Sequence, residues 1–439
     1  MENERLRLFD KADTHIISIG ESKVKSNFKY GNFISPLERV LLNPSEAYFN
    51  DCLNEKKKPV SLELAGPREM IYFDPKKIKC AVVTCGGLCP GINDVIRSIV
   101  LGLYHMYGVS NIYGIKYGFQ GFIPRYGHDI VDLTPELVRN IHVLGGSMLA
   151  SSRGPQKIEE IVDALERLNV SILFVIGGDG TLSAAQLISE EVELRNMKTC
   201  IIGIPKTIDN DILMVSRSFG FETAVDVATQ AIRSAHTEAI GAYNGIGLVK
   251  LMGRESGFVA TSAGLAQRDV NFVLIPEMDF DLKGENGFFN VLKRRLDERG
   301  HAVIVVAEGA GQKFFSNKGI KRDASGNVKL GDIGIFLQRE IKGFFSKNNI
   351  PINLKYIDPS YLIRSTPANS SDNVFCGFLG QNAVHAGMAG KTAMLVGIWN
   401  NTYVHIPLKL VIGGRKKVDL NDRLWLSVLE STGQPSFKD

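Results

Sequence analysis

The stretch VIGGDGTLSA, residues 175–184, decides the fold of this chain, because it joins an apolar run to a glycine-rich turn and a helical pattern. Short, wholly apolar runs such as VSILFVI, residues 170–176, are typical of strands that are covered on both faces. A strand that enters a helix through a tight turn is the repeating unit of α/β proteins. The stretch therefore predicts a parallel sheet with helices on it, and a turn whose backbone can approach an anion.

The same alternation of apolar runs and helical patterns recurs along the chain. Apolar runs of this kind lie at 78–84, 170–176, 199–204, 245–251, 301–307 and 392–398. Between them, apolar residues recur at helical spacing in 93–108 and 157–169. A chain of 439 residues also exceeds the usual size of one domain. We therefore predict an α/β fold of two Rossmann-like lobes, with mainly parallel sheets sandwiched by helices.

Two regions lack this alternation of apolar runs and helical patterns. Residues 1–77 carry NEKKKP and AGPRE, so we expect an N-terminal extension that lies on the surface or at an interface. Residues 280–350, apart from the apolar run at 301–307, hold KGENG and DASGN, so we expect an irregular region with an insertion loop.

The composition excludes several classes of protein. A net charge of +4 predicts no nucleic-acid partner, and no apolar run approaches the roughly 18 residues of a membrane span. The first residues, MENERLRLFD, are charged where a signal peptide needs an apolar core, so we expect a cytoplasmic location. Six scattered cysteines in a chain of this length favour reduced thiols over a disulfide framework.

Two glycine-rich turns are candidates for phosphate binding. TCGGLCPGIND, residues 84–94, follows a predicted strand and opens a helix, and GGDGT, residues 177–181, does the same. Glycines let backbone N–H groups approach phosphate oxygens, and a helix N-terminus favours an anion. Asp179 stands where a carboxylate can hold Mg²⁺ beside the phosphates.

A second acidic segment follows at PKTIDND, residues 205–211. In an extended segment Asp209 and Asp211 point to one side, whereas in a turn they can take different roles. Transfer of a phosphoryl group to an alcohol needs Mg²⁺, cations and a carboxylate that accepts the hydroxyl proton. An acidic helix cap would explain one aspartate, but not both aspartates and Thr207 beside GGDGT.

Several cations follow predicted strands or lie in short turns. Arg254 lies in KLMGRESGF, KYIDPSYLIR contributes Lys355, Tyr361 and Arg364, and Arg153 lies in SSRGPQ. Together these groups suit a substrate with a phosphate of its own.

In their order and spacing, TCGGLCPGIND, SSRG, GGDGT, PKTIDND, KLMGR and YLIR resemble the 6-phosphofructokinase family. The resemblance runs from about residue 70 to beyond residue 400 and is closest to the long-chain, ATP-dependent subgroup with an N-terminal extension. It implies a kinase that phosphorylates the 1-hydroxyl of fructose 6-phosphate with Mg-ATP. It also implies an allosteric homotetramer, with a nucleotide lobe at 78–220 and 365–415 and a sugar-phosphate lobe at 221–364 and 416–439.

The resemblance also implies roles for individual residues. Asp209 is the base, with Thr207 beside it, Arg254 neutralises charge during transfer, and Asp179 binds the metal. The residues expected on the nucleotide are Gly86, Arg153, Gly154, Gly178, Asp179, Gly180 and Thr181. Those expected on the sugar phosphate are Thr207, Ile208, Asp209, Met252, Gly253, Arg254, Glu308, Lys355, Tyr361 and Arg364.

Three positions bear on the donor and on subunit sharing. Short bacterial members have an intersubunit arginine where this chain has Gly245, which puts sharing of the substrate through that residue in doubt. Lys206 is shared with pyrophosphate-dependent members, although the long ATP-using subgroup carries it too. Gly180 favours ATP, because pyrophosphate users typically have an aspartate there that would crowd the α-phosphate.

Other functions stay open at this point. The first alternative is the pyrophosphate-dependent reaction on the same sugar. A non-catalytic regulatory subunit that only binds sugar phosphate is a remote alternative, because the base, metal ligand and anion turns are all present. A NAD kinase or lipid kinase shares GGDGT but has no reason to carry the later motifs.

Overall fold

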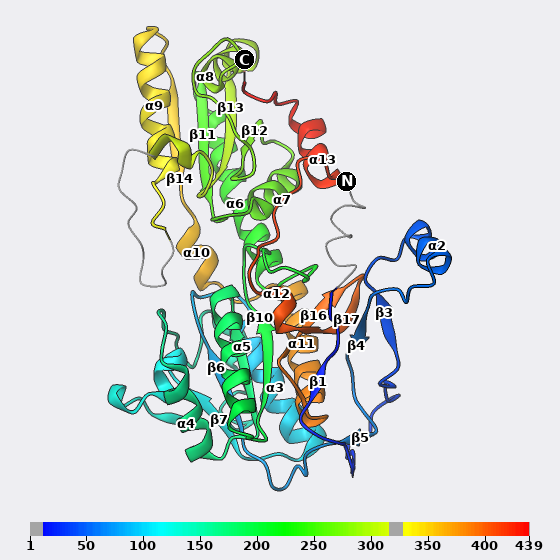
Figure 1. The fold of residues 1–439 in the computed structure, drawn as a ribbon. Coiled ribbons are helices and arrows are strands. Elements are labelled where there is room, and N and C mark those ends of the chain that lie inside the picture. Colours follow the sequence, from blue (N-terminus) through cyan, green and yellow to red (C-terminus); the bar gives the residue numbers. More distant parts are fainter. Residues whose placement is uncertain (1–11, 316–327, 439) are drawn as a thin grey trace. The chain divides into compact units, whose positions relative to one another are not determined.

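The computed structural model describes residues 12–315 and 328–438, in which the chain forms two compact units. Unit 1 comprises the described part of Met1–Thr207 together with Ile212–Phe219 and Pro367–Gly414. Unit 2 comprises Ile208–Asp211, Gly220–Thr366 and the described part of Arg415–Asp439. Each unit has its own central sheet (Figure 1).

Unit 1 is built on a nine-stranded sheet. Its strands are, in spatial order, β3 (Arg39–Leu41), β4 (Ser61–Leu64), β17 (Thr402–Pro407), β16 (Met394–Trp399), β10 (Cys200–Pro205), β9 (Ile172–Gly177), β6 (Cys80–Thr84), β7 (Ile112–Ile115) and β8 (Ile130–Asp132). The five strands from β16 to β7 are parallel, and antiparallel strands complete both edges.

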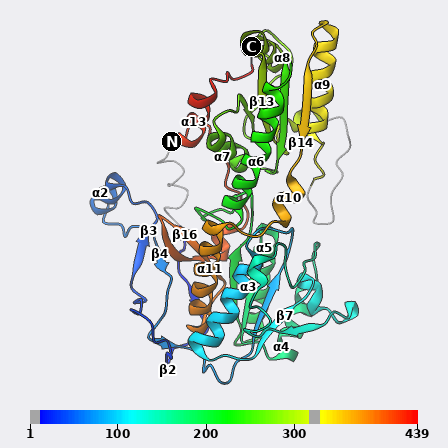
Figure 2. The same ribbon diagram turned by 180° about the vertical axis from the view of Figure 1, so that it is seen from behind.

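Helices cover both faces of this sheet. On one face α4 (Ile158–Leu168) and α5 (Asp179–Leu194) share a buried core with Leu173 and Val175 of β9. On the other face α3 (Ile92–Leu101) and α11 (Ser370–Met388) lie side by side (Figure 2). A Cβ atom on Gly387 of α11 would lie 2.8 Å from Ile172 of β9, so alternate residues of this strand face the two helical layers.

The N-terminal extension supplies β3 and β4, and a buried charge cluster joins it to the sheet. Glu63 of β4 accepts from Arg68 and from Nδ1 of His405, both at 3.0 Å, and pairs with Lys391 at 3.2 Å. Burial alone would raise the pKa of Glu63, but the hydrogen bond from His405 and the charges of Lys391 and Arg68 lower this pKa to about 2. The extension also contains α2 (Glu46–Asn54) and two short strands, β1 (Ile17–Ser18) and β2 (Val24–Lys25), which pair with β15 (Lys391–Thr392) and β5 (Met70–Ile71).

Unit 2 has a four-stranded, wholly parallel sheet. Its order is β12 (Phe272–Leu274), β13 (His301–Ala307), β11 (Gly245–Leu251) and β14 (Asn353–Ile357). The helices packed on it include α6 (Phe221–Ile240), α7 (Phe258–Gln267), α8 (Phe288–Arg299) and α9 (Ile333–Lys347), and α13 (Arg423–Thr432) packs on α7. The short helix α10 (Ser360–Ser365) follows β14.

The predicted α/β class and all six predicted strands are confirmed, and so are the helices near 93–108 and 157–169. The first of these helices ends as a π-helical turn, Gly102–Tyr107. The prediction that 280–350 is irregular was wrong for α8 and α9, whose buried apolar residues recur at helical spacing. DASGN, residues 323–327, lies outside the described residues.

Two expectations from composition can also be compared with the structure. The six cysteines are buried and form no disulfide. Among the helices of residues 12–315 and 328–438, none combines the length and apolar character that a membrane span requires.

Candidate active site

The first glycine-rich turn lies at the carboxyl end of β6, next to the SSRG loop. Gly86 has φ +85°, a backbone conformation that favours glycine, and its N–H donates to the carbonyl of Ser152 at 3.1 Å. Ser151 Oγ in turn donates to the carbonyl of Gly86 at 2.6 Å. These bonds join residues 84–91 to residues 151–154, so two motifs that are distant in the sequence form one loop cluster in unit 1.

Two cations flank this turn. A Cβ atom on Gly87 would lie 3.2 Å from Nη2 of Arg153, and one on Gly86 would lie 3.6 Å from Nζ of Lys206. Lys206 is buried directly after β10, and its Nζ donates to the carbonyl of Gly87 at 2.7 Å. A side chain at Gly87 would therefore contact Arg153 closely, whereas one at Gly86 would lie at an ordinary contact distance from Lys206. Two cations beside a glycine-rich turn suit the binding of phosphate oxygens.

GGDGT follows β9 and begins α5. Gly178 caps the helix without a side chain, and Asp179, Gly180 and Thr181 form its first turn. A Cβ atom on Gly180 would meet no heavy atom within 4 Å, so the space beside this exposed residue is open. Because the N–H of Lys206 donates to the carbonyl of Gly177 at 2.9 Å, this turn lies next to the end of β10. Gly154, with φ +95°, completes the nucleotide set, and all of these residues belong to unit 1.

The chain enters unit 2 after Thr207, and the two aspartates of PKTIDND then diverge. Asn210 has φ +52°, so the segment turns instead of running extended. Asp211 is buried and pairs with Arg415 at 3.5 Å. Asp209 receives a hydrogen bond on its backbone carbonyl from Ser256 Oγ at 3.2 Å. Of the two geometries that the sequence allowed, the structure has the turn and not the extended segment.

The Asp209 carboxyl group has a strongly perturbed pKa. Its Oδ1 is shielded from solvent, and burial is the largest cause that raises the pKa to about 7. The charges of Asp211 and Glu308 raise this pKa further, whereas the backbone N–H of Arg254 and the charge of Arg364 lower it. A carboxyl group that titrates near neutral pH is suited to accept a proton from a hydroxyl group.

The sugar motifs lie at the carboxyl ends of the strands of unit 2. Leu251 at the end of β11 pairs with Ala307 at the end of β13, and the N–H of Glu308 donates to the carbonyl of Leu251 at 2.9 Å. Gly253 has φ +127°, and a Cβ atom there would lie 2.5 Å from the carbonyl oxygen of Ser256. Only glycine therefore fits between the buried Met252 and Arg254 without strain.

Glu308 and the nearby cations are electrostatically coupled. Burial raises the pKa of Glu308, while the charges of Arg364, Arg254 and Lys250 lower it. The guanidinium of Arg254 also donates to the carbonyl of Val328. Arg364 and the exposed Tyr361 are presented by α10, so the structure gathers Asp209, Arg254, Glu308 and Arg364 in unit 2.

Lys355 does not lie with this group. It is exposed on β14 and pairs in register with Gly247, four residues before the end of β11. Gly245, where short family members have an arginine, begins β11, and a Cβ atom there would overlap the carbonyl oxygen of Ala239. The backbone of α6 therefore excludes any side chain at residue 245.

The sequence analysis missed Lys250 and Asp358, although both lie inside motifs that it singled out. Their Nζ and Oδ2 atoms are 2.9 Å apart. The signal that could have found them is the register of β11 and β14, because Val249 pairs with Ile357 and the next residues are Lys250 and Asp358.

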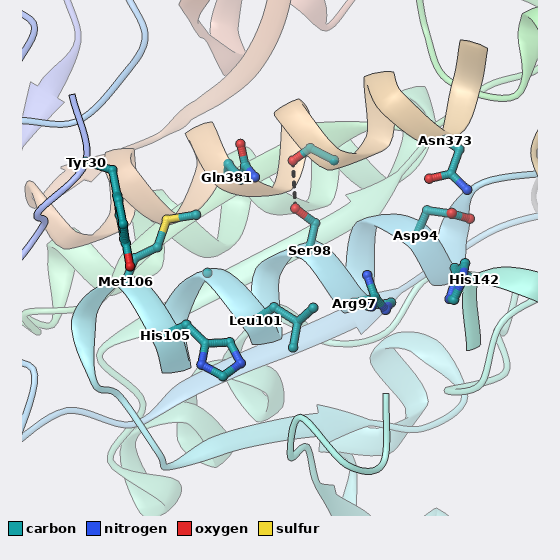
Figure 3. Close-up of a pocket in the computed structure, with 12 residues that line it drawn as sticks. Tyr30, Asp94, Arg97, Ser98, Leu101, His105, Met106, His142, Asn373 and Gln381 are labelled. Atoms are coloured by element: carbon teal, nitrogen blue, oxygen red, sulfur yellow. Dashed lines mark hydrogen bonds between the residues drawn. The ribbon is translucent and has the colours of Figure 1, made fainter. Parts of the chain in front are cut away.

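A separate pocket of about 310 Å³ lies in unit 1 along α3 and α11 (Figure 3). None of the residues expected on nucleotide or sugar lines it. Asp94, His142 and Asn373 lie at one end of the pocket, and Ser98 Oγ donates across it to the carbonyl of Gly377 at 2.6 Å. Burial is the largest cause that raises the pKa of Asp94 to about 6. The charge of Asp372 raises this pKa slightly further, whereas a backbone hydrogen bond and the charge of Arg97 lower it.

Comparisons with known proteins show the family of the chain. Residues 79–387 match the family model described as phosphofructokinase. An ATP-dependent 6-phosphofructokinase of Borreliella burgdorferi is 54% identical over 88% of this chain and 88% of that protein. One of Amycolatopsis methanolica is 45% identical over 92% of this chain and 89% of that protein. The chain belongs to the phosphofructokinase family.

A solved structure gives the same result for the fold. The crystal structure of a pyrophosphate-dependent phosphofructokinase from Marinobacter aquaeolei superposes with a TM-score of 0.66. The superposition covers 81% of this chain and 91% of that one at 19% sequence identity, so this likeness supports the fold alone.

Proposed function

We propose that this chain transfers the γ-phosphoryl group of ATP to the 1-hydroxyl of fructose 6-phosphate, giving fructose 1,6-bisphosphate and ADP. The observation that supports this proposal most directly is the pKa of Asp209, which is raised to about 7 in a group with Glu308, Arg254 and Arg364. Lys206, which is bonded to the first glycine-rich turn, stands only three residues earlier in the chain. One short segment thus bears both a phosphate-binding cation and a base.

Asp209 acts as the general base in this proposal. As the sugar oxygen forms its bond to the γ-phosphorus, the bond from that phosphorus to the bridging oxygen of ADP breaks, and the hydroxyl proton passes to the Asp209 carboxylate. A pKa near neutral lets Asp209 be ionised before transfer and still hold the proton afterwards. Thr207 lies beside the base in the sequence, and Arg254 stabilises the charge that develops on the transferred group.

The nucleotide is assigned to unit 1. Backbone groups at Gly86 and at 178–181 approach its phosphates, with Arg153 and Gly154 beside them. Asp179 would hold Mg²⁺, which neutralises charge on the phosphates when it is bound. No group of three acidic, histidine or cysteine side chains that could hold a metal occurs among the described residues. One carboxylate still fits Mg²⁺, because this ion keeps several waters and takes further ligands from the phosphates.

The sugar phosphate is assigned to unit 2. Arg364 and Tyr361 receive the 6-phosphate, whereas Lys355, which is exposed on β14 away from these two residues, is not assigned to it. Ile208, Met252, Gly253, Arg254 and Glu308 hold the sugar. The position of the half-buried Glu308 among cations supports this assignment, because a carboxylate is suited to accept hydrogen bonds from sugar hydroxyls.

ATP is favoured over pyrophosphate as the donor. The open space beside Gly180 leaves room for an α-phosphate, and the relatives with the higher identities named above are ATP-dependent. Lys206 does not decide between the donors, since a cation beside the transferred phosphate stabilises charge with either one.

The test is a coupled assay with fructose 6-phosphate in which ATP and pyrophosphate are compared at equal concentration, with and without Mg²⁺. We expect turnover with ATP, dependence on Mg²⁺, and a product phosphorylated at the 1-position. Turnover with pyrophosphate alone would instead establish the alternative donor. Binding of fructose 6-phosphate without turnover by either donor would favour a regulatory subunit.

We extend the proposal to the setting of the enzyme, which we expect to be an allosteric homotetramer in the cytoplasm. The basis is the family resemblance. Sedimentation of the purified chain tests the assembly, and fractionation of cells tests the location.

A further inference from the structure

Lys250 is the only residue of β11 that is not fully buried, and it is held between two carboxylates. Its side chain is 12% exposed, and Nζ lies 3.1 Å from Oδ2 of Asp332 and 2.9 Å from Oδ2 of Asp358. Burial by itself would lower the pKa of Lys250, but the hydrogen bonds that its ammonium group donates to Asp358 and Asp332 outweigh burial and raise this pKa. The ammonium group is therefore charged at any physiological pH.

The Asp358 contact leads directly to the helix that carries the sugar-phosphate residues. Oδ1 of Asp358 accepts from the backbone N–H of Ser360 at 3.1 Å and from its hydroxyl at 2.5 Å. Ser360 begins α10, which presents Tyr361 and Arg364. One carboxylate thus binds β11 through Oδ2 and the start of α10 through Oδ1.

The β11 side of the contact leads to the other sugar motif. β11 ends at Leu251, one residue after Lys250, and the motif that includes Met252 and Arg254 follows at once. The charge of Lys250 is also among the groups that lower the pKa of Glu308. A substitution at Lys250 should therefore affect both the motif that includes Arg254 and the helix α10, although the ammonium group of Lys250 contacts two carboxylates of the protein.

Asp332 provides an internal comparison. It contacts the same ammonium group, but its Oδ1 caps α9 by accepting from the N–H of Ile335 at 3.1 Å. Its side chain is 48% exposed, and none of its hydrogen bonds reaches α10. The two carboxylates therefore differ in what they position, although they contact the same lysine.

We propose that Lys250 and Asp358 form a positioning pair that fixes α10 against the end of β11 and so sets the affinity for the phosphate of the sugar substrate. The inference rests on the proposed function. It assigns neither residue to the reacting atoms, because Lys250 contacts protein side chains, namely Asp332, Asp358 and Tyr356, and Asp358 contacts Lys250 and Ser360.

The test compares Lys250→Met, Asp358→Asn and Asp332→Asn in the full chain, with steady-state kinetics and thermal unfolding measured for each. Lys250→Met and Asp358→Asn should raise KM for fructose 6-phosphate by about 5- to 50-fold while kcat and KM for ATP change less than about threefold. The double variant should be no worse than the worse single variant, because both act through one contact. Lys250→Arg keeps a cation between the carboxylates and should recover part of the affinity.

Asp332→Asn is the matched control, since asparagine also caps helices well, and it should change KM for the sugar less than about twofold. An unchanged KM in Asp358→Asn would overturn the proposal even if Lys250→Met failed to fold. An equal rise in Asp332→Asn would also overturn it, because the effect would then not depend on the link to α10. A wild-type chain that does not phosphorylate fructose 6-phosphate is a different result and would remove the proposed function instead.

Discussion

Nζ of Lys206 donates a hydrogen bond to the carbonyl oxygen of Gly87 at 2.7 Å, so the end of β10 is tied to the turn that follows β6. This bond orients one N–H of the ammonium group and holds its charge beside the glycines that are expected to contact the nucleotide. Lys206 is 6% exposed, so its charge is poorly screened by water.

Replacement of Lys206 by methionine should therefore slow transfer more than it weakens sugar binding. We expect kcat with ATP to fall by about 10- to 1000-fold, as for the loss of one group that stabilises transition-state charge, with KM for fructose 6-phosphate nearly unchanged. Steady-state kinetics and the unfolding temperature are the measurements. A fully active, stably folded variant would remove Lys206 from the reaction.

Gly180→Asp should change the choice of donor. A side chain at this position meets no protein atom within 4 Å, and an acidic residue in the first turn of a helix is favourable, so the variant should fold. Its carboxylate would oppose the α-phosphate by space and charge, which predicts a selective rise in KM for ATP. Affinity for the sugar should be kept, and any activity with pyrophosphate should be unchanged or increased. Saturation with ATP at the wild-type concentration would contradict the steric argument.

Asp209→Ser should lower kcat on the order of 10²- to 10⁴-fold with little loss of sugar binding, the usual effect of removing a general base. In the wild-type chain kcat/KM should fall as the pH drops through about 7, because the protonated carboxyl group cannot accept a proton. Asp211→Asn removes a charge that raises the pKa of Asp209, so the acid limb of the profile should move to lower pH. An acid limb that stays in place would show that another group controls it.

Arg364→Ala and Lys355→Ala separate two residues that the family resemblance treats alike. Arg364→Ala should raise KM for the sugar phosphate by about 2 kcal/mol or roughly 30-fold, whereas Lys355→Ala should change this KM little, because Lys355 is exposed and lies away from Arg364. Only Arg364→Ala should also move the acid limb to higher pH, because Arg364 lowers the pKa of Asp209 and of Glu308. Unchanged KM in Arg364→Ala would place the phosphate elsewhere.

Asp94→Asn should stabilise unit 1 at neutral pH. Folding raises the pKa of Asp94 from 3.8 to about 6, so between these values the folded chain binds more protons than the unfolded chain and stability falls as the pH rises. The asparagine variant escapes this loss, which predicts a gain of about 1 to 3 kcal/mol above pH 6 and little gain below pH 4. Denaturant unfolding at several pH values measures it, with the exposed Asp226→Asn as the control. A gain that does not vary with pH would point to packing instead.

Six strands of the two sheets could be read from the sequence, because they are buried and almost wholly apolar. The runs that became β6, β9, β10, β11 and β13 are almost wholly apolar, so their burial is visible without knowledge of their neighbours. β4 is different. Its sequence, SLEL, contains Glu63, whose burial depends on cations that come from elsewhere in the chain.

The site could be predicted as a set of motifs, but not as a set of contacts. Motifs that follow parallel strands meet at one edge of a sheet, which is why the order of the motifs was informative. The pairing of Lys250 with Asp358 depends on the register of two strands that are about 100 residues apart in sequence, and no local pattern encodes it. The separation of Asp209 from Asp211 depends on the left-handed backbone at Asn210, which the sequence permitted but did not require.

The charge cluster around Glu63 has a consequence for the order in which the chain folds. Glu63 and His405 are 342 residues apart, so β4 leaves the ribosome long before its neighbour β17 exists. Until then Glu63 lacks two of its partners, Lys391 and His405, and contacts of such long range are slow to form. Unit 1 can therefore complete this edge of its sheet only after β17 has been made, and a chain that stalls before residue 402 leaves β4 without its strand partner on that side.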